Sequence, residues 1–139
     1  MNTDARIEEK PLSLIWAAFL MATLMYAGIG WFLGQGERTP INLEILNWVQ
    51  IFLGLAALPI LLTVFLLRQL LAAVTRRSYR NYCIVRWALL ELIGVFGLVQ
   101  FILGGHFEVL LIFVAVAALA IGAARPGASD RAAWVGQFD

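Results

Sequence analysis

Long apolar stretches alternate with short polar segments along this chain of 139 residues. Asp, Glu, Lys and Arg are absent from four stretches, residues 11–36, 45–67, 92–107 and 109–124. A helix needs about 20 mainly apolar residues to cross the hydrocarbon core of a bilayer, and only a helix keeps its backbone polar groups paired there. The pattern therefore predicts four transmembrane helices, at residues 12–33, 45–67, 83–103 and 107–124.

Short connections join these helices. Gly and Pro mark residues 34–44 as a loop, Gly104 to His106 predict a tight turn, and Pro126–Gly127 ends the fourth helix. Helices joined by short loops tend to pack beside one another, first on second, second on third and third on fourth. The expected fold is an all-α, up-down-up-down bundle over residues 12–124, with polar tails at 1–11 and 125–139.

The basic residues predict the orientation of the bundle. Nine of the ten Lys and Arg residues fall on one side of the predicted helices, and only Arg38 falls on the other. Because basic loops stay in the cytoplasm, both termini are expected there, in a multi-pass protein of a cell membrane. The nine are Arg6, Lys10, Arg68, Arg76, Arg77, Arg80, Arg86, Arg125 and Arg131.

Composition supports the membrane interpretation and excludes several functions. Hydrophobic residues make up 62% of the chain and charged residues 14%, against about 45–50% and 25% in globular domains. A net charge of +1 gives no basis for binding nucleic acid. One Cys and one His are too few for structural zinc, and no catalytic motif occurs, so neither an enzyme nor a cofactor is expected.

Glu91 is the main candidate site, because it is a carboxyl group near the middle of the third predicted helix. Such residues commonly mark ion paths or proton relays, although a hydrogen bond that fastens two helices is an equally physical role. Residues at the same depth are Thr23 on the first helix and Thr63 on the second. Pro59 leaves the carbonyl of Leu55 without its helical donor, which provides a further acceptor.

A second group of candidates is basic. Arg76, Arg77, Arg80 and Arg86 lie near the cytoplasmic ends of the second and third predicted helices. Arg86 is about 140° around the helix from Glu91, so it is expected to extend to the lipid headgroups rather than to pair with that carboxyl. The whole group is interpreted as a contact for anionic lipid or for a partner protein.

The run from Ala88 to Val99, with Glu91 in an Ala-Leu-Leu-Glu segment followed by Gly97-Leu98-Val99, resembles the second helix of the ATP synthase proteolipid, subunit c. In that family the glutamate carries the translocated ion, so the resemblance implies an ion-carrying role for Glu91. The layout of the whole chain is similar to small bacterial four-helix membrane proteins called subunit c-like, which implies a bacterial inner membrane. The helix at 45–67 differs from the proteolipid, because Gly54 is its only glycine.

These observations leave two functions open. The first is an accessory or scaffold subunit of a membrane complex, in contact with lipid and with other membrane subunits or copies of itself. The second is a proton- or cation-handling protein that uses Glu91. A polar group facing Glu91 inside the bundle would separate them.

Overall fold

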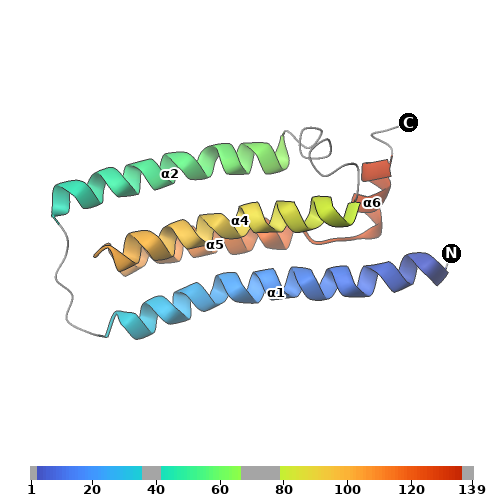
Figure 1. Ribbon diagram of the computed structural model, residues 1–139, viewed down its shortest axis with the longest axis horizontal. Helices are drawn as coiled ribbons and strands as arrows, with labels where there is room; N and C mark the ends of the chain where they lie inside the picture. The colour runs from blue at the N-terminus through green and yellow to red at the C-terminus, as the bar shows by residue number, and fades with distance from the viewer. Residues whose placement is uncertain (1–2, 36–41, 67–78, 136–139) are drawn as a thin grey trace.

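The computed structural model describes residues 3–35, 42–66 and 79–135, and all elements within them are helices. Four are long and apolar: α1 (Thr3–Leu33), α2 (Leu43–Phe65), α4 (Tyr79–Ile102) and α5 (Phe107–Ala123). A fifth, α6 (Ala128–Val135), is short and follows α5. Successive long helices run in alternating directions, and the beginning of α1 lies at the same end of the molecule as α6 (Figure 1).

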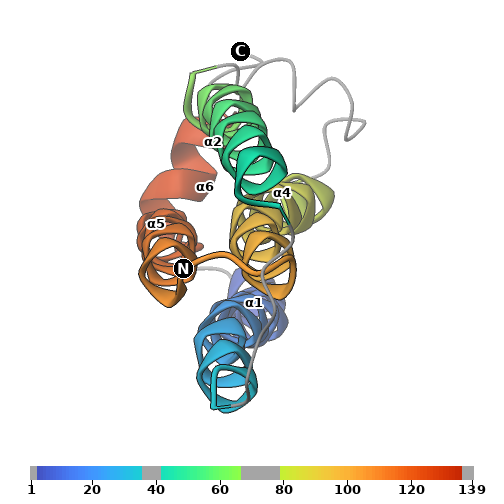
Figure 2. The same ribbon diagram turned by 90° about the vertical axis from the view of Figure 1, so that its left-hand side faces the viewer.

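The helices α4 and α5 form a central pair that is flanked on opposite sides by α1 and α2. The end-on view in Figure 2 shows this arrangement, in which α1 packs on both α4 and α5 whereas α2 packs on α4. The expected contact between the first and second helices is therefore wrong. Nine residues separate Leu33 from Leu43, which can extend about 30 Å, so this connection is long enough to place α2 across the bundle.

Helices extend into both predicted tails. α1 begins at Thr3 rather than near residue 12, because residues 5–10 are mostly good helix formers, and Pro11 lies inside it. The tail after residue 125 contains α6, which the sequence interpretation missed. Three helices, at Pro11–Leu33, Leu43–Phe65 and Tyr79–Ile102, are long and apolar enough to cross a membrane, and Phe107–Ala123 is apolar but shorter.

Local signals explain where the elements begin and end. The side chain of Asn42 caps α2 by accepting a hydrogen bond from the backbone N–H of Glu44 at 3.1 Å. The tight turn predicted after α4 is confirmed, with Gly104 at a φ of 97°, a conformation that favours glycine. The backbone N–H groups of Gly104 and Gly105 donate to the carbonyls of Phe101 and Gln100, which closes the helix end.

The most buried helix is α4, and glycines let its neighbours approach it. Gly94 faces α1, where an added Cβ would lie 3.2 Å from the ring of Tyr26 and 3.3 Å from Thr23. Gly97 faces α5, where an added Cβ would lie 2.5 Å from the Cβ of Phe113. The core between these helices is mainly apolar, and it also encloses the polar side chains of Thr23 and Gln100. Its fully buried apolar side chains include Trp87, Leu90, Ile93, Leu110 and Ile121.

Candidate functional site

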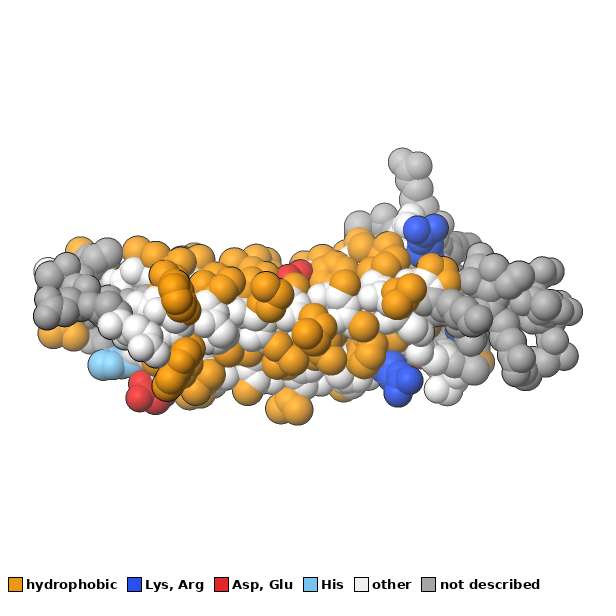
Figure 3. All heavy atoms as spheres, turned by 90° about the horizontal axis from the view of Figure 1, so that it is seen from below, with side chains coloured by type: hydrophobic (Ala, Val, Ile, Leu, Met, Phe, Trp, Pro, Cys, Tyr) orange, Lys and Arg blue, Asp and Glu red, His pale blue; other side chains and the backbone are white. Residues whose placement is uncertain are grey.

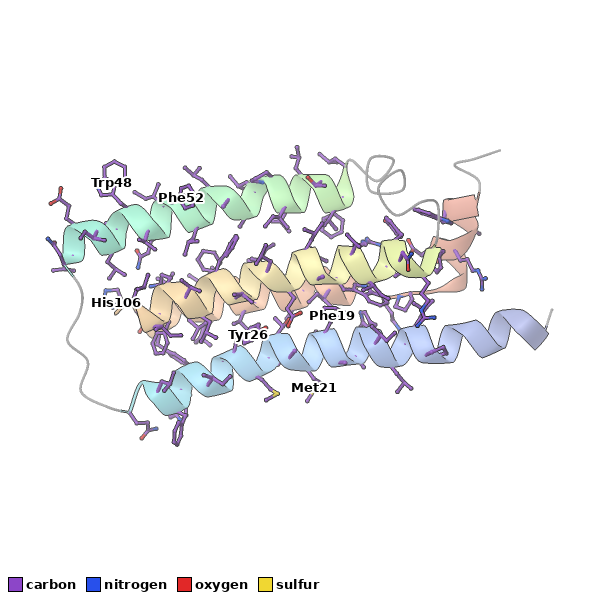
Figure 4. All side chains as sticks on the ribbon, viewed as in Figure 1. Phe19, Met21, Tyr26, Trp48, Phe52 and His106 are labelled. Carbon is purple, nitrogen blue, oxygen red and sulfur yellow. The ribbon has the colours of Figure 1, made fainter. Side chains whose placement is uncertain are left out.

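Glu91 faces α1, and its partner is a tyrosine. The hydroxyl of Tyr26 on α1 donates a hydrogen bond to Oε1 of Glu91 at 2.7 Å. Figure 4 shows Tyr26 extending from α1 toward α4, whereas Met21 on the same helix points away. The close approach at Gly94, three residues after Glu91, brings the two helices near enough for this bond. The carboxyl group is therefore part of an interhelical contact at half depth in the bundle.

The predicted partners of Glu91 do not bond to it. Thr23 is fully buried at the α1–α4 contact, but its hydroxyl donates to the carbonyl of Phe19 on its own helix at 3.0 Å. Thr63 and Pro59 belong to α2, which lies on the opposite side of α4 from α1 (Figure 2). Pro59 is exposed and lines a shallow apolar groove of α2. These three assignments as ligands of Glu91 are corrected, because depth alone does not determine which helix a side chain faces.

Tyr26 was missed by the sequence analysis, although a signal for it exists. Trp16, Phe19, Thr23, Tyr26 and Gly30 recur every three or four residues and so lie on one face of α1. All five are buried or half-buried. This spacing would have placed Tyr26 on the packed face, one turn beyond Thr23.

The Tyr26–Glu91 hydrogen bond joins α1 to α4. Tyr26 is the hydrogen-bond partner of Glu91 among the described residues, and both side chains are half-buried. The same residues hold no group of three or more His, Cys, Asp or Glu side chains able to bind a metal ion. A carboxyl group paired with a neutral hydroxyl between two apolar helices can hold the helices together, and the carboxyl group can also bind a proton.

A second polar site lies where α6 meets the beginning of α4. We call it the end cluster, defined as Tyr79, Tyr82, Arg86, Asp130 and Trp134. The Tyr79 hydroxyl donates to Oδ2 of Asp130 at 3.0 Å, and Nη1 of Arg86 lies 3.6 Å from Oδ1. The ring of Trp134 packs on that of Tyr82, with 4.4 Å between centroids.

This cluster corrects the expected role of Arg86. Arg86 is buried, with 8% of its surface exposed, and does not extend to lipid headgroups. Its guanidinium carbon lies 5.5 Å from the ring centroid of Phe65 on α2 and 5.8 Å from that of Tyr82. The reason is that Asp130, in the missed helix α6, provides a counter-charge. Arg80 is exposed as expected, and Arg76 and Arg77 lie outside the described residues.

Two tryptophans fix the C-terminal end of α5. The indole N–H of Trp16 on α1 donates to the carbonyl of Ile121 at 2.8 Å. That of Trp87 on α4 donates to the carbonyl of Ala124 at 2.9 Å. The Ala124 carbonyl ends the helix, where backbone donors are missing, so the Trp87 indole satisfies a group that helix geometry leaves open. The Ile121 carbonyl also accepts the backbone N–H of Ala124 at 3.1 Å, so the Trp16 indole is its second donor. Through these bonds α5 is held by both of its neighbours.

Searches for related proteins add no assignment to this geometry. No protein-family model, curated protein or solved structure matches the chain.

Proposed function

We propose that the chain is a multi-pass membrane protein, with four transmembrane helices and cytoplasmic termini, that serves as an accessory or scaffold subunit of a membrane complex. The observation that carries the membrane part is the distribution of large apolar side chains. Leu14, Phe32, Phe52 and Leu119 are 72%, 79%, 71% and 75% exposed, on three different helices. In Figure 4 Phe52 and Trp48 point from α2 away from the bundle. Lipid is a solvent in which such side chains carry no hydration cost.

The charges at the two ends support the proposed orientation. Figure 3 shows basic side chains toward one end of a largely apolar face, and histidine and acidic atoms at the other end, with a further acidic group about midway. Among described residues, Arg80, Arg125 and Arg131 lie near the end that holds α6. Excess basic residues on one side favour a cytoplasmic location for that side. The α5 helix, with 17 residues, spans about 25 Å, which is short for a bilayer but sufficient when its flanking turns enter the interface.

The accessory role rests on how the polar side chains are used. Glu91, Tyr26, Trp16 and Trp87 bond to neighbouring helices of the same chain. In hydrocarbon such bonds contribute to the association of helices, so these groups serve the architecture of the bundle. The outer faces of α1 and α2 are broad and apolar, which suits lateral contact with other membrane subunits.

The second candidate function is proton or cation handling by Glu91, and the Tyr26 hydroxyl beside the carboxyl is the observation that favours it. In this alternative, Glu91 binds and releases a proton while Tyr26 stabilises the carboxylate. Glu91→Gln separates the two candidates, because glutamine accepts the Tyr26 hydrogen bond but cannot release a proton. Full biological activity of this variant excludes proton handling, whereas normal folding with lost activity supports it.

The scaffold proposal is tested in native membranes. The tagged chain, solubilised in mild detergent, should migrate in an assembly well above its own 15.4 kDa and retain the same stoichiometric partners when Glu91 is changed to Gln. Migration as a monomer without partners would contradict the scaffold role. A reporter fused after Asp139 should be active only as a cytoplasmic reporter, and activity on the other side would contradict the topology.

A further inference from the structure

The short helix α6 is held in place mainly by long side chains. Asp130 bonds to Tyr79 and pairs with Arg86, and four residues later Trp134 inserts among the rings of Tyr79 and Tyr82. Trp134 is only 4% exposed. A helix of eight residues is not stable by itself in water. The position of α6 therefore depends on the contacts that Asp130 and Trp134 make.

Arg86 connects α6 to the end of α2. Its guanidinium is buried between Asp130 of α6 and the ring of Phe65, the last residue of α2. A buried charge needs a counter-charge, and Asp130 is the acidic side chain that faces it among the described residues. The place of Arg86 over Phe65 thus depends on α6 remaining docked.

We infer that α6 is a latch that, through the ion pair between Asp130 and Arg86, fixes the end of α2 against α4, and that release of α6 frees that end. When α6 leaves, Arg86 loses its counter-charge while it lies near the end of the bundle. Its long side chain then turns toward water or headgroups, as arginines near helix ends do, and moves away from Phe65. The end of α2 keeps only its apolar contacts with α4.

The contacts are suited to a latch that opens without unfolding the protein. The Arg86–Asp130 separation of 3.6 Å is longer than a hydrogen bond, so this ion pair lacks the short, directed contact of the strongest charged pairs. Pro126 and Gly127 separate α6 from α5, which lets α6 move without disturbing that helix. Elements held by few contacts open locally at a small fraction of the global stability. The latch involves contacts within this chain alone and does not depend on the proposed scaffold role.

The first test measures opening at Cys83, the only cysteine of the chain. Cys83 is 2% exposed and belongs to the same buried cluster as Tyr82 and Trp134, so this packing must open before a reagent can enter. Asp130→Asn keeps the shape of the side chain and the bond from Tyr79 but removes the charge. In detergent micelles, maleimide should label Cys83 roughly tenfold faster in this variant than in the wild type. The exposed Ser129→Ala is the matched control and should label at the wild-type rate.

The second test measures the coupling to α2. Spin labels at the exposed positions Leu62 on α2 and Leu119 on α5, with Cys83 changed to Ser, report the distance between these helices. Asp130→Asn and Arg86→Gln should both broaden this distance distribution, and Ser129→Ala should not.

Two results would contradict the latch, and a substitute variant is available if Asp130→Asn does not fold. Unchanged Cys83 labelling in Asp130→Asn would overturn the latch. Faster labelling with an unchanged distance distribution would overturn the coupling to α2. If Asp130→Asn loses helical circular dichroism, Trp134→Ala takes its place in both measurements, and Trp134→Phe, which retains an aromatic ring, should remain close to the wild type.

Discussion

The helices α1 and α2 flank the α4–α5 pair from opposite sides, yet they are attached by different means. Both are apolar, and both expose most of their surface. The described side chains of α1 include hydrogen-bond donors to other helices, Trp16 to the carbonyl of Ile121 and Tyr26 to Glu91. No described side chain of α2 bonds to another helix, and its polar attachment is the cation–π contact of Phe65 with Arg86.

In the proposed membrane location, helices have no hydrophobic driving force toward one another, and the difference shows which contacts then determine the position of a helix. In lipid, apolar surface gains little from facing another helix, so close packing and hydrogen bonds decide which faces meet. α1 has both, with Gly30 against Leu110 and Tyr26 against Glu91. α2 has no such glycine contact and no hydrogen bond to another helix among its described side chains. We therefore expect α1 to keep a fixed position and α2 to shift more easily when its neighbours change.

A matched pair of glycine substitutions should give the largest contrast. At Gly30 an added Cβ would overlap the buried side chain of Leu110 and lie 3.3 Å from Phe107, whereas at Gly54 no atom lies within 4 Å. Gly30→Leu should lower the free energy of unfolding by about 3 kcal/mol, because α1 must move away from α5. Gly54→Leu should raise it by up to about 1 kcal/mol through helix propensity. Unfolding in mixed micelles measures both, and equal effects would contradict the proposed asymmetry.

The tryptophans give a smaller contrast between the same two helices. Trp16→Phe leaves the Ile121 carbonyl without its indole donor and should lower the free energy of unfolding by about 1 kcal/mol. Trp48 on α2 is 67% exposed and points away from the bundle (Figure 4). Trp48→Phe should therefore change stability by less than about 0.5 kcal/mol. The same unfolding measurement tests the pair, and a larger loss at Trp48 would show that α2 is anchored more firmly than its contacts suggest.

The sequence was sufficient for the four long helices and for the contacts of the second with the third and of the third with the fourth, but not for the place of the first helix or for α6. Apolar length identified all four long helices, and the turn at Gly104 followed from its residues. Which helices touch depends on small and polar residues on particular faces, such as Gly94 opposite Tyr26. Connection length does not contain that information, so the expected contact between the first two helices was wrong.

The site was predicted only in part, for a related reason. Glu91 was identified because a carboxyl group is conspicuous in an apolar segment, but Tyr26 was not, because tyrosine is ordinary there. Arg86 was assigned to lipid because its counter-charge lies 44 residues away, in the helix α6 that the Pro126–Gly127 stop obscured. A partner distant in sequence is visible only once the packing is known.

The smallest stability loss expected at a contact between helices concerns the bond between Tyr26 and Glu91. Tyr26→Phe removes the donor and keeps the ring, so the loss should be about 0.6 kcal/mol, the average for hydrogen bonds between transmembrane helices. Glu91→Leu should cost a similar amount, and the double variant should cost little more than either single one, because the bond can be lost only once. Strictly additive losses would show that the two side chains do not cooperate. Glu91→Gln accepts the same hydrogen bond and should be as stable as the wild type. A Glu91→Gln protein that is stable but inactive would support proton handling rather than a purely structural role for Glu91.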